Sequence, residues 1–313
     1  MSFTVPPFLQ PGASVRIVAP ASPLPSRRQF LAGLAWLGTR YRLRMSADVL
    51  AREGYLAGSD DLRLDALQRA LGEEGTQAIV LARGGYGITR LLERLDLGPL
   101  LRAPKWLVGF SDGTALHAAA QAAGLCSLHA SNVNGLAALH AGDRDAWLRA
   151  LEGLGDAGFR HHALRGDRLT AVEGPAFGGN LSLVQALAAQ GRLSVPPGAI
   201  WFVEDVSERP YRLDRMATSL RPYVRSAGAI VLGEFFGCGP GLDGVTAETA
   251  LASAWGDLGV PIVHGAPFGH GVRNAPVVLG ATTRVEIDST GRARVAQVVS
   301  SSTISSRSSS STS

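Results

Sequence analysis

Residues 106–123 read WLVGFSDGTALHAAAQAA and join a short apolar strand, 106–110, to an Ala-rich helix that begins near Asp112. A buried strand that turns directly into a helix is typical of α/β proteins, in which crossover helices connect the strands of a parallel sheet. We therefore expect residues 106–123 to be one strand–helix unit of such a sheet.

The same alternation extends over residues 14–154. Apolar, β-branched runs predict strands at 15–19, 41–45, 77–82 and 106–110. Amphipathic runs predict helices at 27–37, 60–71, 88–95 and 112–123. This order predicts an α/β fold with an N-terminal doubly wound parallel-sheet domain, of the Rossmann or flavodoxin type, over residues 1–154.

A second domain is expected after a polar, Gly-rich linker at 155–170. Within 171–299, strands are predicted at 199–203 and 229–232, and helices at 181–189, 210–220 and 247–255. The runs 277–279 and 283–287 predict a closing hairpin or small sheet. We expect a smaller, C-terminal α/β domain with a mostly β closing region, followed by a disordered Ser-rich tail at 300–313.

The charge balance argues against a nucleic-acid partner. The 313 residues include 30 Lys and Arg against 26 Asp and Glu, a net charge of +4, although the pI is about 9.5. Lys105 is the single lysine, and the arginines are scattered among acidic residues. A nucleic-acid surface gathers its basic residues into a patch or stripe, so we expect no nucleic-acid binding.

The cysteines and the first residues predict a cytoplasmic location. Cys126 and Cys238 are too few for a disulfide framework, which favours a reducing compartment. Residues 1–7 lack the basic and apolar regions of a signal peptide. Since no stretch approaches the roughly 20 apolar residues of a membrane span, we also expect no membrane partner.

Residues 109–113, Gly-Phe-Ser-Asp-Gly, match the G-x-S-x-G pattern of a nucleophile elbow. In such an elbow a tight turn between strand and helix lifts the serine hydroxyl above the sheet, and the helix N-terminus directs N–H groups at an oxyanion. Ser111 is therefore a candidate nucleophile. The same five residues also fit an ordinary helix N-cap flanked by turn glycines.

A serine nucleophile needs a base, and His270 is a plausible one because it stands in the rigid, glycine-flanked loop 267–271 after a strand. His129 follows a strand and could line a pocket or be structural. The remaining histidines fit surface, capping or helix positions better: His117, His140, His161, His162 and His264.

An orienting carboxylate could come from Glu204 or Asp205, at the C-terminal end of the strand 199–203, where α/β sheets place functional residues. Strand alternation sends the two side chains to opposite faces, so at most one can point at the site. Either could instead form ion pairs with nearby arginines: Arg209, Arg212 and Arg215.

The loop 83–87, Arg-Gly-Gly-Tyr-Gly, also lies between a predicted strand and a predicted helix. Its free backbone N–H groups could bind an anion. The loop lacks the glycine spacing and the Lys-Ser/Thr of phosphate-binding loops. It fits better as the second half of an oxyanion hole, supplied by a neighbouring strand–helix loop.

Taken together, these segments resemble the bacterial LD-carboxypeptidases (muramoyltetrapeptide carboxypeptidases), a family that also includes the microcin C self-immunity peptidases. The resemblance spans residues 11–299 and rests on motifs in the family's order: 12–22 (GASVRIVAPAS), 54–60 (GYLAGSD), 82–87 (ARGGYG), 109–112 (GFSD) with 114–116 (TAL), 178–182 (GGNLS), 204–206 (EDV) with 208–211 (ERPY), and 269–270 (GH).

The resemblance implies a serine peptidase with a triad of Ser111, Glu204 and His270, in a cleft between the two domains. It implies an oxyanion hole built from the backbone N–H groups of Asp112 and of Gly85, with Gly84 as the other glycine in question. Arg83 and Gly84 are candidate substrate-binding residues, and Arg83 could hold a substrate carboxylate. The resemblance also implies a homodimer that needs no metal ion or organic cofactor.

The implied activity is cleavage of the L,D peptide bond that releases the terminal D-alanine of cytoplasmic murein tetrapeptides, through an acyl-enzyme, during peptidoglycan recycling. One alternative is an immunity-type peptidase that cleaves aminoacyl or peptidyl adenylates. Such enzymes stack an aromatic residue on their ligand from a longer insertion, whereas residues 154–176 contain no Trp, and Phe159 is the nearest candidate. A second alternative is a non-catalytic muropeptide or nucleotide binder.

Overall fold

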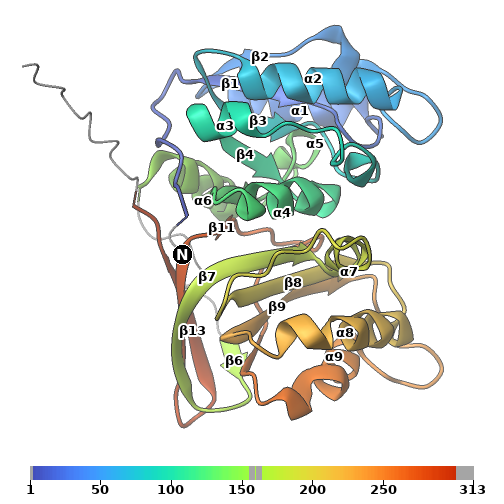
Figure 1. The fold of residues 1–313 in the computed structure, drawn as a ribbon, viewed down its shortest axis with the longest axis vertical. Coiled ribbons are helices and arrows are strands. Elements are labelled where there is room, and N and C mark those ends of the chain that lie inside the picture. Colours follow the sequence, from blue (N-terminus) through green and yellow to red (C-terminus); the bar gives the residue numbers. More distant parts are fainter. Residues whose placement is uncertain (1–2, 155–158, 160–163, 301–313) are drawn as a thin grey trace, which may run out of the picture.

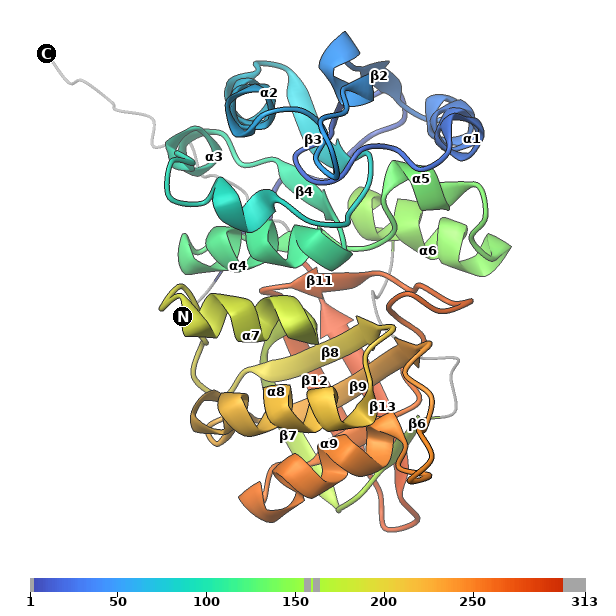
Figure 2. The same ribbon diagram turned by 90° about the vertical axis from the view of Figure 1, so that its right-hand side faces the viewer.

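The computed structural model describes residues 3–154, 159 and 164–300, which form two units stacked one on the other (Figures 1 and 2). The upper unit is an open, mostly parallel sheet with helices on both faces, and the lower unit is a closed barrel with helices on one side. The predicted α/β class and the parallel N-terminal sheet are thereby confirmed.

The upper sheet has the strand order β11-β5-β4-β3-β1-β2. Its members are β1 (Ser14–Val18), β2 (Arg42–Arg44), β3 (Thr76–Leu81), β4 (Trp106–Gly109), β5 (Ser127–His129) and β11 (Val277–Leu279). The strands β1 to β5 pair in parallel, and β11 runs antiparallel to β5. The carboxyl ends of β3 and β4 therefore meet at one edge of the sheet. The loop 83–87, called the glycine loop below, and the turn at 110–113, called the Ser111 turn, begin there.

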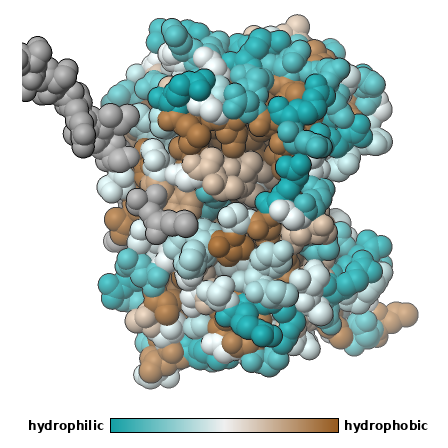
Figure 3. Space-filling view, in the orientation of Figure 1, coloured by the Kyte–Doolittle hydropathy of each residue, from teal (hydrophilic) through white to brown (hydrophobic). Residues whose placement is uncertain are grey.

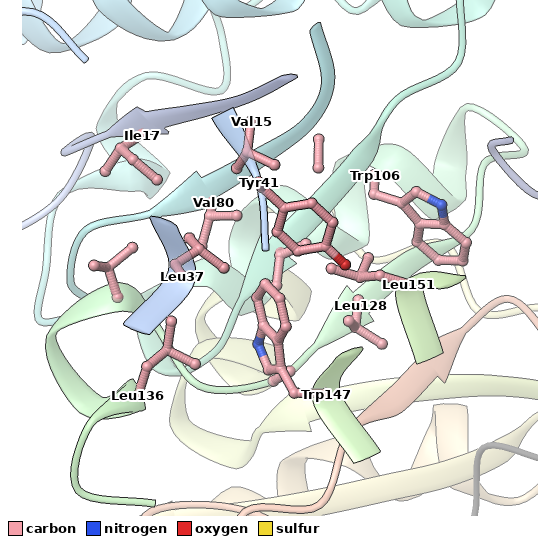
Figure 4. Close-up of a cluster of buried hydrophobic side chains, with 14 of the residues drawn as sticks. Val15, Ile17, Leu37, Tyr41, Val80, Trp106, Leu128, Leu136, Trp147 and Leu151 are labelled. Carbon is pink, nitrogen blue, oxygen red and sulfur yellow. The ribbon is translucent and has the colours of Figure 1, made fainter. Parts of the chain in front are cut away.

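Helices cover the two faces of this sheet. They are α1 (Arg27–Gly38), α2 (Asp60–Gly72), α3 (Gly98–Arg102), α4 (Thr114–Ala122), α5 (Val133–Leu136) and α6 (Ala141–Glu152), with short 3₁₀ turns η1 (Ala47–Leu50), η2 (Ile88–Arg90) and η3 (Ser111–Gly113). Alternate strand residues point to opposite faces: Val15 and Val80 pack with α1, α5 and α6 (Figure 4), and Ile79 packs with α2, α3 and α4.

The lower unit is a barrel with the strand order β10-β6-β13-β12-β7-β8-β9, closed by pairing between β9 and β10. Its strands are β6 (Leu164–Gly166), β7 (Thr170–Asn180), β8 (Ile200–Val206), β9 (Ala229–Phe236), β10 (Ile262–His264), β12 (Thr282–Ile287) and β13 (Arg292–Val298). The helices are α7 (Leu181–Ala189), α8 (Pro210–Val224) and α9 (Ala247–Trp255), followed by η4 (Gly256–Leu258). They pack on the outer face of β8 and β9, whereas Phe202 and Phe268 fill the interior.

The predicted hairpin between 277–279 and 283–287 is wrong. β11 crosses to the upper sheet and pairs with β5, while β12 pairs with β7 and β13. All three residues of β11 are buried, whereas β12 alternates between buried and more exposed residues. A strand that is apolar on both faces suits the covered edge of the upper sheet, and Gly280, with φ +88°, allows the sharp turn between the two strands.

Two other expectations need adjustment. The predicted helix at 88–95 is only the 3₁₀ turn η2, and the helix expected from Asp112 begins with η3 before α4. Of the predicted linker, residues 155–158 and 160–163 lie outside the described residues, and Leu164–Gly166 forms β6. The predicted disordered tail lies, from residue 301 onward, outside the described residues as well.

The two units meet tightly behind the Ser111 turn. Asn180 at the end of β7 donates its backbone N–H to Thr114 Oγ1 at the start of α4, over 3.0 Å. A Cβ at Gly179 would come within 2.5 Å of the same hydroxyl oxygen, so only glycine allows this approach. Gln121 on α4 adds a hydrogen bond to the carbonyl of Ala176. These contacts fix the position of the upper sheet's carboxyl edge relative to the barrel.

Hydrophilic side chains cover the outer rims of the face shown in Figure 3, and hydrophobic ones gather toward the middle of the molecule. Among the described residues, none of the helices combines the length and the apolar character that a bilayer crossing requires.

Candidate functional site

Ser111 lies at a strained turn between β4 and η3. Its φ of 63° is in the left-handed region, which is uncommon for a residue with a side chain. A Cβ at Gly109 would come within 2.6 Å of Leu81 Cδ1 and 2.9 Å of Asn132 Oδ1, so the residue before the turn must be small. Strain at a serine between a strand and a helical turn is the geometry that the G-x-S-x-G pattern predicts.

His117 supports this turn from below. Its Nε2 lies 2.9 Å from the carbonyl oxygen of Gly109, and its Nδ1 lies 2.9 Å from Ser127 Oγ. Burial lowers the pKa of His117 to about 3, so the imidazole is neutral. Because a carbonyl can only accept, Nε2 carries the proton and Nδ1 accepts from the serine. His117 therefore anchors the turn and faces away from the position of a base.

Glu204 and His270 lie next to each other on the side of the barrel that faces the upper sheet. Glu204 lies in β8, and its Oε2 is 2.7 Å from Nδ1 of His270, which stands in the loop after β10. A Cβ at Gly269 would come within 2.9 Å of Glu204 Oε2, so glycine lets this loop approach the carboxylate closely. This hydrogen bond uses Nδ1, and Nε2 is the other polar atom of the His270 ring.

The charges of this pair stabilise one another. Burial alone would raise the pKa of Glu204, but the facing imidazoles of His129 and His270 outweigh it and lower the pKa to about 2. Burial opposes the charged form of His270, yet the hydrogen bond and the charge of Glu204 raise the pKa of His270 above its ordinary value. Glu204 is thus an anion that favours protonation of His270.

Asp205 points to the opposite face of β8, as strand alternation predicts. Its carboxylate accepts hydrogen bonds from Asn180 Nδ2 at 3.0 Å and from the backbone N–H of Ser182 at 2.9 Å. The second of these bonds caps the start of α7. Burial raises the pKa of Asp205 to about 6. Within the described residues, neither Asp205 nor Glu204 forms the ion pairs with arginine that the sequence left open.

Ser111 and His270 line one pocket of about 390 Å³. The other residues around it come from the segments that follow β3, β4 and β5 of the upper sheet and from the barrel: Arg83, Gly84, Gly85, Phe110, Asn132, Asn134, Gly135 and Val206. The ring of Phe110 lies 4.7 Å from that of His270, centroid to centroid. In the part of the chain that the structure describes, no hydrogen bond joins Ser111 Oγ to His270; in ligand-free sites such bonds are often long.

The glycine loop 83–87 presses against the Ser111 turn. A Cβ at Gly84 would lie 2.8 Å from Ser111 Cβ, and Gly85 has a φ of 104° that disfavours a side chain. Ser22 holds the loop from behind: its N–H donates to the carbonyl of Gly84, and its Oγ accepts from the N–H of Tyr86 at 3.1 Å. The glycines therefore place backbone directly beside the serine.

The side chain of Asp112 ties this loop to the turn, a role that the sequence did not indicate. Its fully buried carboxylate accepts the backbone N–H of Ile88 at 2.8 Å. Burial raises the pKa of Asp112 to about 6, although hydrogen bonds from Ile88 and Gly87 oppose the shift. The backbone N–H of Asp112 belongs to the first turn of η3, where N–H groups lack partners within the helix.

Arg83 and Arg52 both donate hydrogen bonds to the segment 23–24. Arg83 Nη1 donates to the carbonyl of Pro23 at 2.5 Å, and Arg52 Nη2 donates to the next carbonyl, that of Leu24, at 3.0 Å. Among the described residues neither arginine has a carboxylate partner. Burial and the charge of Arg52 lower the pKa of Arg83. Arg83, which lines the pocket, therefore has the positive charge of Arg52 beside it.

Of the remaining histidines, His264 is the last residue of β10, where a capping position was predicted. His140 caps α6 by accepting the N–H of Gly142, while His161 and His162 lie outside the described residues. His129, for which the sequence left a pocket and a structural position open, is buried 3.9 Å from Glu204. Over residues 3–154, 159 and 164–300, no cluster of three or more His, Cys, Asp or Glu side chains is arranged to bind a metal ion.

Two family profiles match the chain: an LD-carboxypeptidase N-terminal domain over residues 15–130 and an LD-carboxypeptidase C-terminal domain over residues 173–285. The murein tetrapeptide carboxypeptidase of Pseudomonas aeruginosa is 35% identical over 292 residues, which cover 87% of this chain and 92% of that protein.

Solved structures share the fold. The muramoyltetrapeptide carboxypeptidase from Oxalobacter formigenes superposes with a TM-score of 0.79 at 25% identity, covering 91% of this chain and 99% of that one. The microcin C7 self immunity protein MccF superposes with a TM-score of 0.81 at 18% identity, covering 97% of this chain and all of that one. From the two profile matches and the identity along nearly its whole length, the chain belongs to the LD-carboxypeptidase family.

Proposed function

We propose that this protein is a serine-type LD-carboxypeptidase that releases the terminal D-alanine from murein tetrapeptides. The observation that carries the proposal is the shared pocket: Ser111, strained at its turn, and His270, bonded to the buried anion Glu204, line it from the two units. The name of the Pseudomonas aeruginosa relative supports the choice of substrate.

The reaction begins with attack of Ser111 Oγ on the carbonyl carbon of the L,D bond. Nε2 of His270 takes the hydroxyl proton as the Oγ–C bond forms, and Glu204 holds Nδ1 and stabilises the imidazolium. When the tetrahedral intermediate collapses, the C–N bond breaks and His270 gives its proton to the amine of D-alanine. Water then attacks the acyl-enzyme and gives a proton to His270. The bond between Ser111 Oγ and the carbonyl carbon breaks, His270 returns the proton to Ser111 Oγ, and the tripeptide leaves with a new free carboxylate.

The oxyanion of the intermediate is bound by backbone N–H groups. We assign one to Asp112, at the start of η3, and the other to Gly85, in the loop that packs on Ser111. Gly84 is the other glycine that could supply the second donor. Loss of one such donor costs on the order of 10²–10³ in rate in other serine peptidases. The bond from Ile88 to the Asp112 carboxylate supports this arrangement, because it fixes the two loops relative to each other.

A carboxypeptidase must recognise the free carboxylate at the end of its substrate, and Arg83 is the residue we assign to it. Arg83 lines the pocket, and its positive charge has no carboxylate partner within the described residues. Guanidinium groups bind carboxylates bidentately, through two parallel hydrogen bonds. The proximity of Arg52 adds a second positive charge on the same side.

The immunity-type activity is the alternative, because MccF shares the fold. The residue that bears on this alternative is Phe159, the aromatic candidate for stacking on an adenylate. Phe159 is buried in the barrel interior, stacked on Phe268 with ring centroids 6.0 Å apart. A side chain in that position is unavailable to a ligand in the pocket, which favours the murein peptide as substrate.

The test is to incubate the purified protein separately with a muramoyl tetrapeptide and with an aminoacyl sulfamoyl adenylate, and to follow both by mass spectrometry. The proposal predicts that the tetrapeptide loses one alanine residue and that the adenylate analogue stays intact. Hydrolysis of the analogue without cleavage of the tetrapeptide would favour the immunity-type activity. Tight binding of either compound without turnover would favour the non-catalytic binder.

Three further expectations stay predictions: a homodimer, a cytoplasmic location and a place in peptidoglycan recycling. Analytical ultracentrifugation tests the first, with a mass of about twice the 32.7 kDa chain as the expected result. Cell fractionation tests the second. Accumulation of tetrapeptide in cells that lack the gene would support the third.

A further inference from the structure

Glu204 has one carboxylate oxygen that is not used by His270. Oε2 takes the hydrogen bond from the imidazole, whereas Oε1 is buried and has no hydrogen-bond partner among the described residues. The whole side chain is inaccessible to solvent. A buried carboxylate oxygen without a donor is costly, so a neighbouring group is expected to satisfy it.

His129 is the polar side chain that faces this oxygen. Its Nε2 lies 3.9 Å from Glu204 Oε1, and both of its ring nitrogens are also without hydrogen-bond partners within the described residues. The imidazole is 1% exposed. Unpartnered polar atoms of two side chains therefore face each other across a gap about 1 Å longer than an ordinary hydrogen bond.

Aromatic rings hold the imidazole of His129 in this place. Phe110 and Phe268 both meet it edge to face, at centroid distances of 6.0 and 5.8 Å, and His117 lies 6.3 Å away. Among the described residues no partner lies at hydrogen-bond distance from either nitrogen of His129, and Nε2 faces Glu204 Oε1 at 3.9 Å.

The two side chains come from different units of the molecule. His129 ends β5 and pairs with Gly109 of β4, next to the Ser111 turn, while Glu204 belongs to β8 of the barrel. A hydrogen bond between them would therefore link the sheet that carries Ser111 directly to the carboxylate that orients His270.

We propose that His129 is a positioning residue, which donates its Nε2–H to Glu204 Oε1 and so fixes the plane of the carboxylate. With Oε1 held by His129 and Oε2 by His270, the carboxylate has one orientation instead of two, and His270 keeps its place relative to Ser111. This role rests on the proposed serine peptidase activity, but the hydrogen bond itself can be measured without a substrate.

The test uses variants that separate the effect of the hydrogen-bond donor at position 129 from the effect of the side chain's shape. In His129→Gln an amide N–H replaces the ring N–H, whereas His129→Met has a similar length and no donor. His129→Phe also lacks the donor but preserves the ring packing with Phe110 and Phe268, and it replaces the Met variant if that one does not fold, as judged by circular dichroism.

Two readouts are needed. In proton NMR of the free protein, the downfield resonance of the His270 N–H bonded to Glu204 should persist in the parent and in His129→Gln, and should broaden or vanish in the Met and Phe variants. With tetrapeptide, kcat of the donor-less variants should fall by roughly 10- to 100-fold with KM little changed, as expected for misplaced catalytic groups, and the Gln variant should recover most of the loss.

An unchanged resonance and kcat in His129→Met or His129→Phe would overturn the proposal, and so would a Gln variant as impaired as the Met variant. Failure of the proposed function looks different, because the parent protein itself would then release no D-alanine. The NMR comparison still decides the position of Glu204 in that case.

Discussion

At the scale of single residues, the proposed site depends on a strained serine, a buried anion and a histidine that the anion makes more basic. Glu204 is fully buried, yet its pKa falls to about 2 because the imidazoles of His129 and His270 face it. The consequence passes to His270, whose pKa is raised. The chemistry of this pair is therefore readable in the pH dependence of the reaction.

As the proposed base, His270 can act only when it is neutral. Because its pKa lies above the ordinary 6.5, kcat/KM should fall as the pH drops through a midpoint above 6.5. Glu204→Gln removes the charge that raises this pKa, so the midpoint should move to lower pH, and kcat should fall by about 10⁴-fold, as for the corresponding change in another triad. A midpoint that stays in place in Glu204→Gln would contradict the assigned pair.

Gly84 offers a second prediction at this scale. A Cβ there would lie 2.8 Å from Ser111 Cβ and 3.2 Å from the carbonyl oxygen of Phe110, so Gly84→Ala must displace the turn or the loop. We expect a fall in kcat of about 10²-fold from this displacement. The matched control is Gly72→Ala at the end of α2, where the new methyl group meets no atom within 4 Å. Equal activity of both variants would mean that the loop does not contribute to the site.

At the scale of elements, the loop that carries His270 is fastened to the upper unit. Arg273 donates from Nε and Nη2 to the carboxylate of Asp143, at 2.8 and 2.7 Å, and the N–H of Asn274 adds a bond at 3.1 Å. Asp143 lies in the first turn of α6 and is 1% exposed. One salt bridge therefore joins a helix of the upper unit to the loop beside Glu204.

Breaking this salt bridge should affect both stability and catalysis. Arg273→Ala leaves the buried Asp143 carboxylate with only the Asn274 N–H, and we expect a loss of roughly 2–3 kcal/mol, below the value for a fully buried pair because Arg273 is about one-third exposed. Urea unfolding measures the loss, and kcat should fall with it.

Arg284→Ala is the control, since it breaks an exposed pair with Glu286 that should be worth less than about 1 kcal/mol. If the two variants are equally stable, the salt bridge of Arg273 does not fasten the loop.

At the scale of the whole molecule, the proposed site lies where the two units meet. Ser111 and the glycine loop come from the carboxyl edge of the parallel sheet, and Glu204 and His270 come from the barrel. β11 strengthens this arrangement, because the chain returns from the loop of His270 to the upper sheet before it closes the barrel. The two units are thus connected by three crossings of the chain.

Local features of the fold and site could be predicted from the sequence, and long-range ones could not. Strands β1 to β4, β8 and β9 and the turn at Ser111 follow from neighbouring residues, whereas β6, β7 and β13 were not predicted. Alternation separated Glu204 from Asp205, but only the family resemblance assigned Glu204. The crossing of β11 and the closure of the barrel depend on pairing between distant strands. The place of His129 beside Glu204 was hidden for the same reason.

The most direct test of the central claim compares the release of D-alanine from a muramoyl tetrapeptide by the parent protein, by Ser111→Ala and by Ser253→Ala, which changes an exposed serine on α9. The account predicts that kcat/KM falls by at least about 10⁴-fold in Ser111→Ala and stays at the parent value in Ser253→Ala. Release of D-alanine by Ser111→Ala at the parent rate would contradict the assignment of the nucleophile and of the site between the two units.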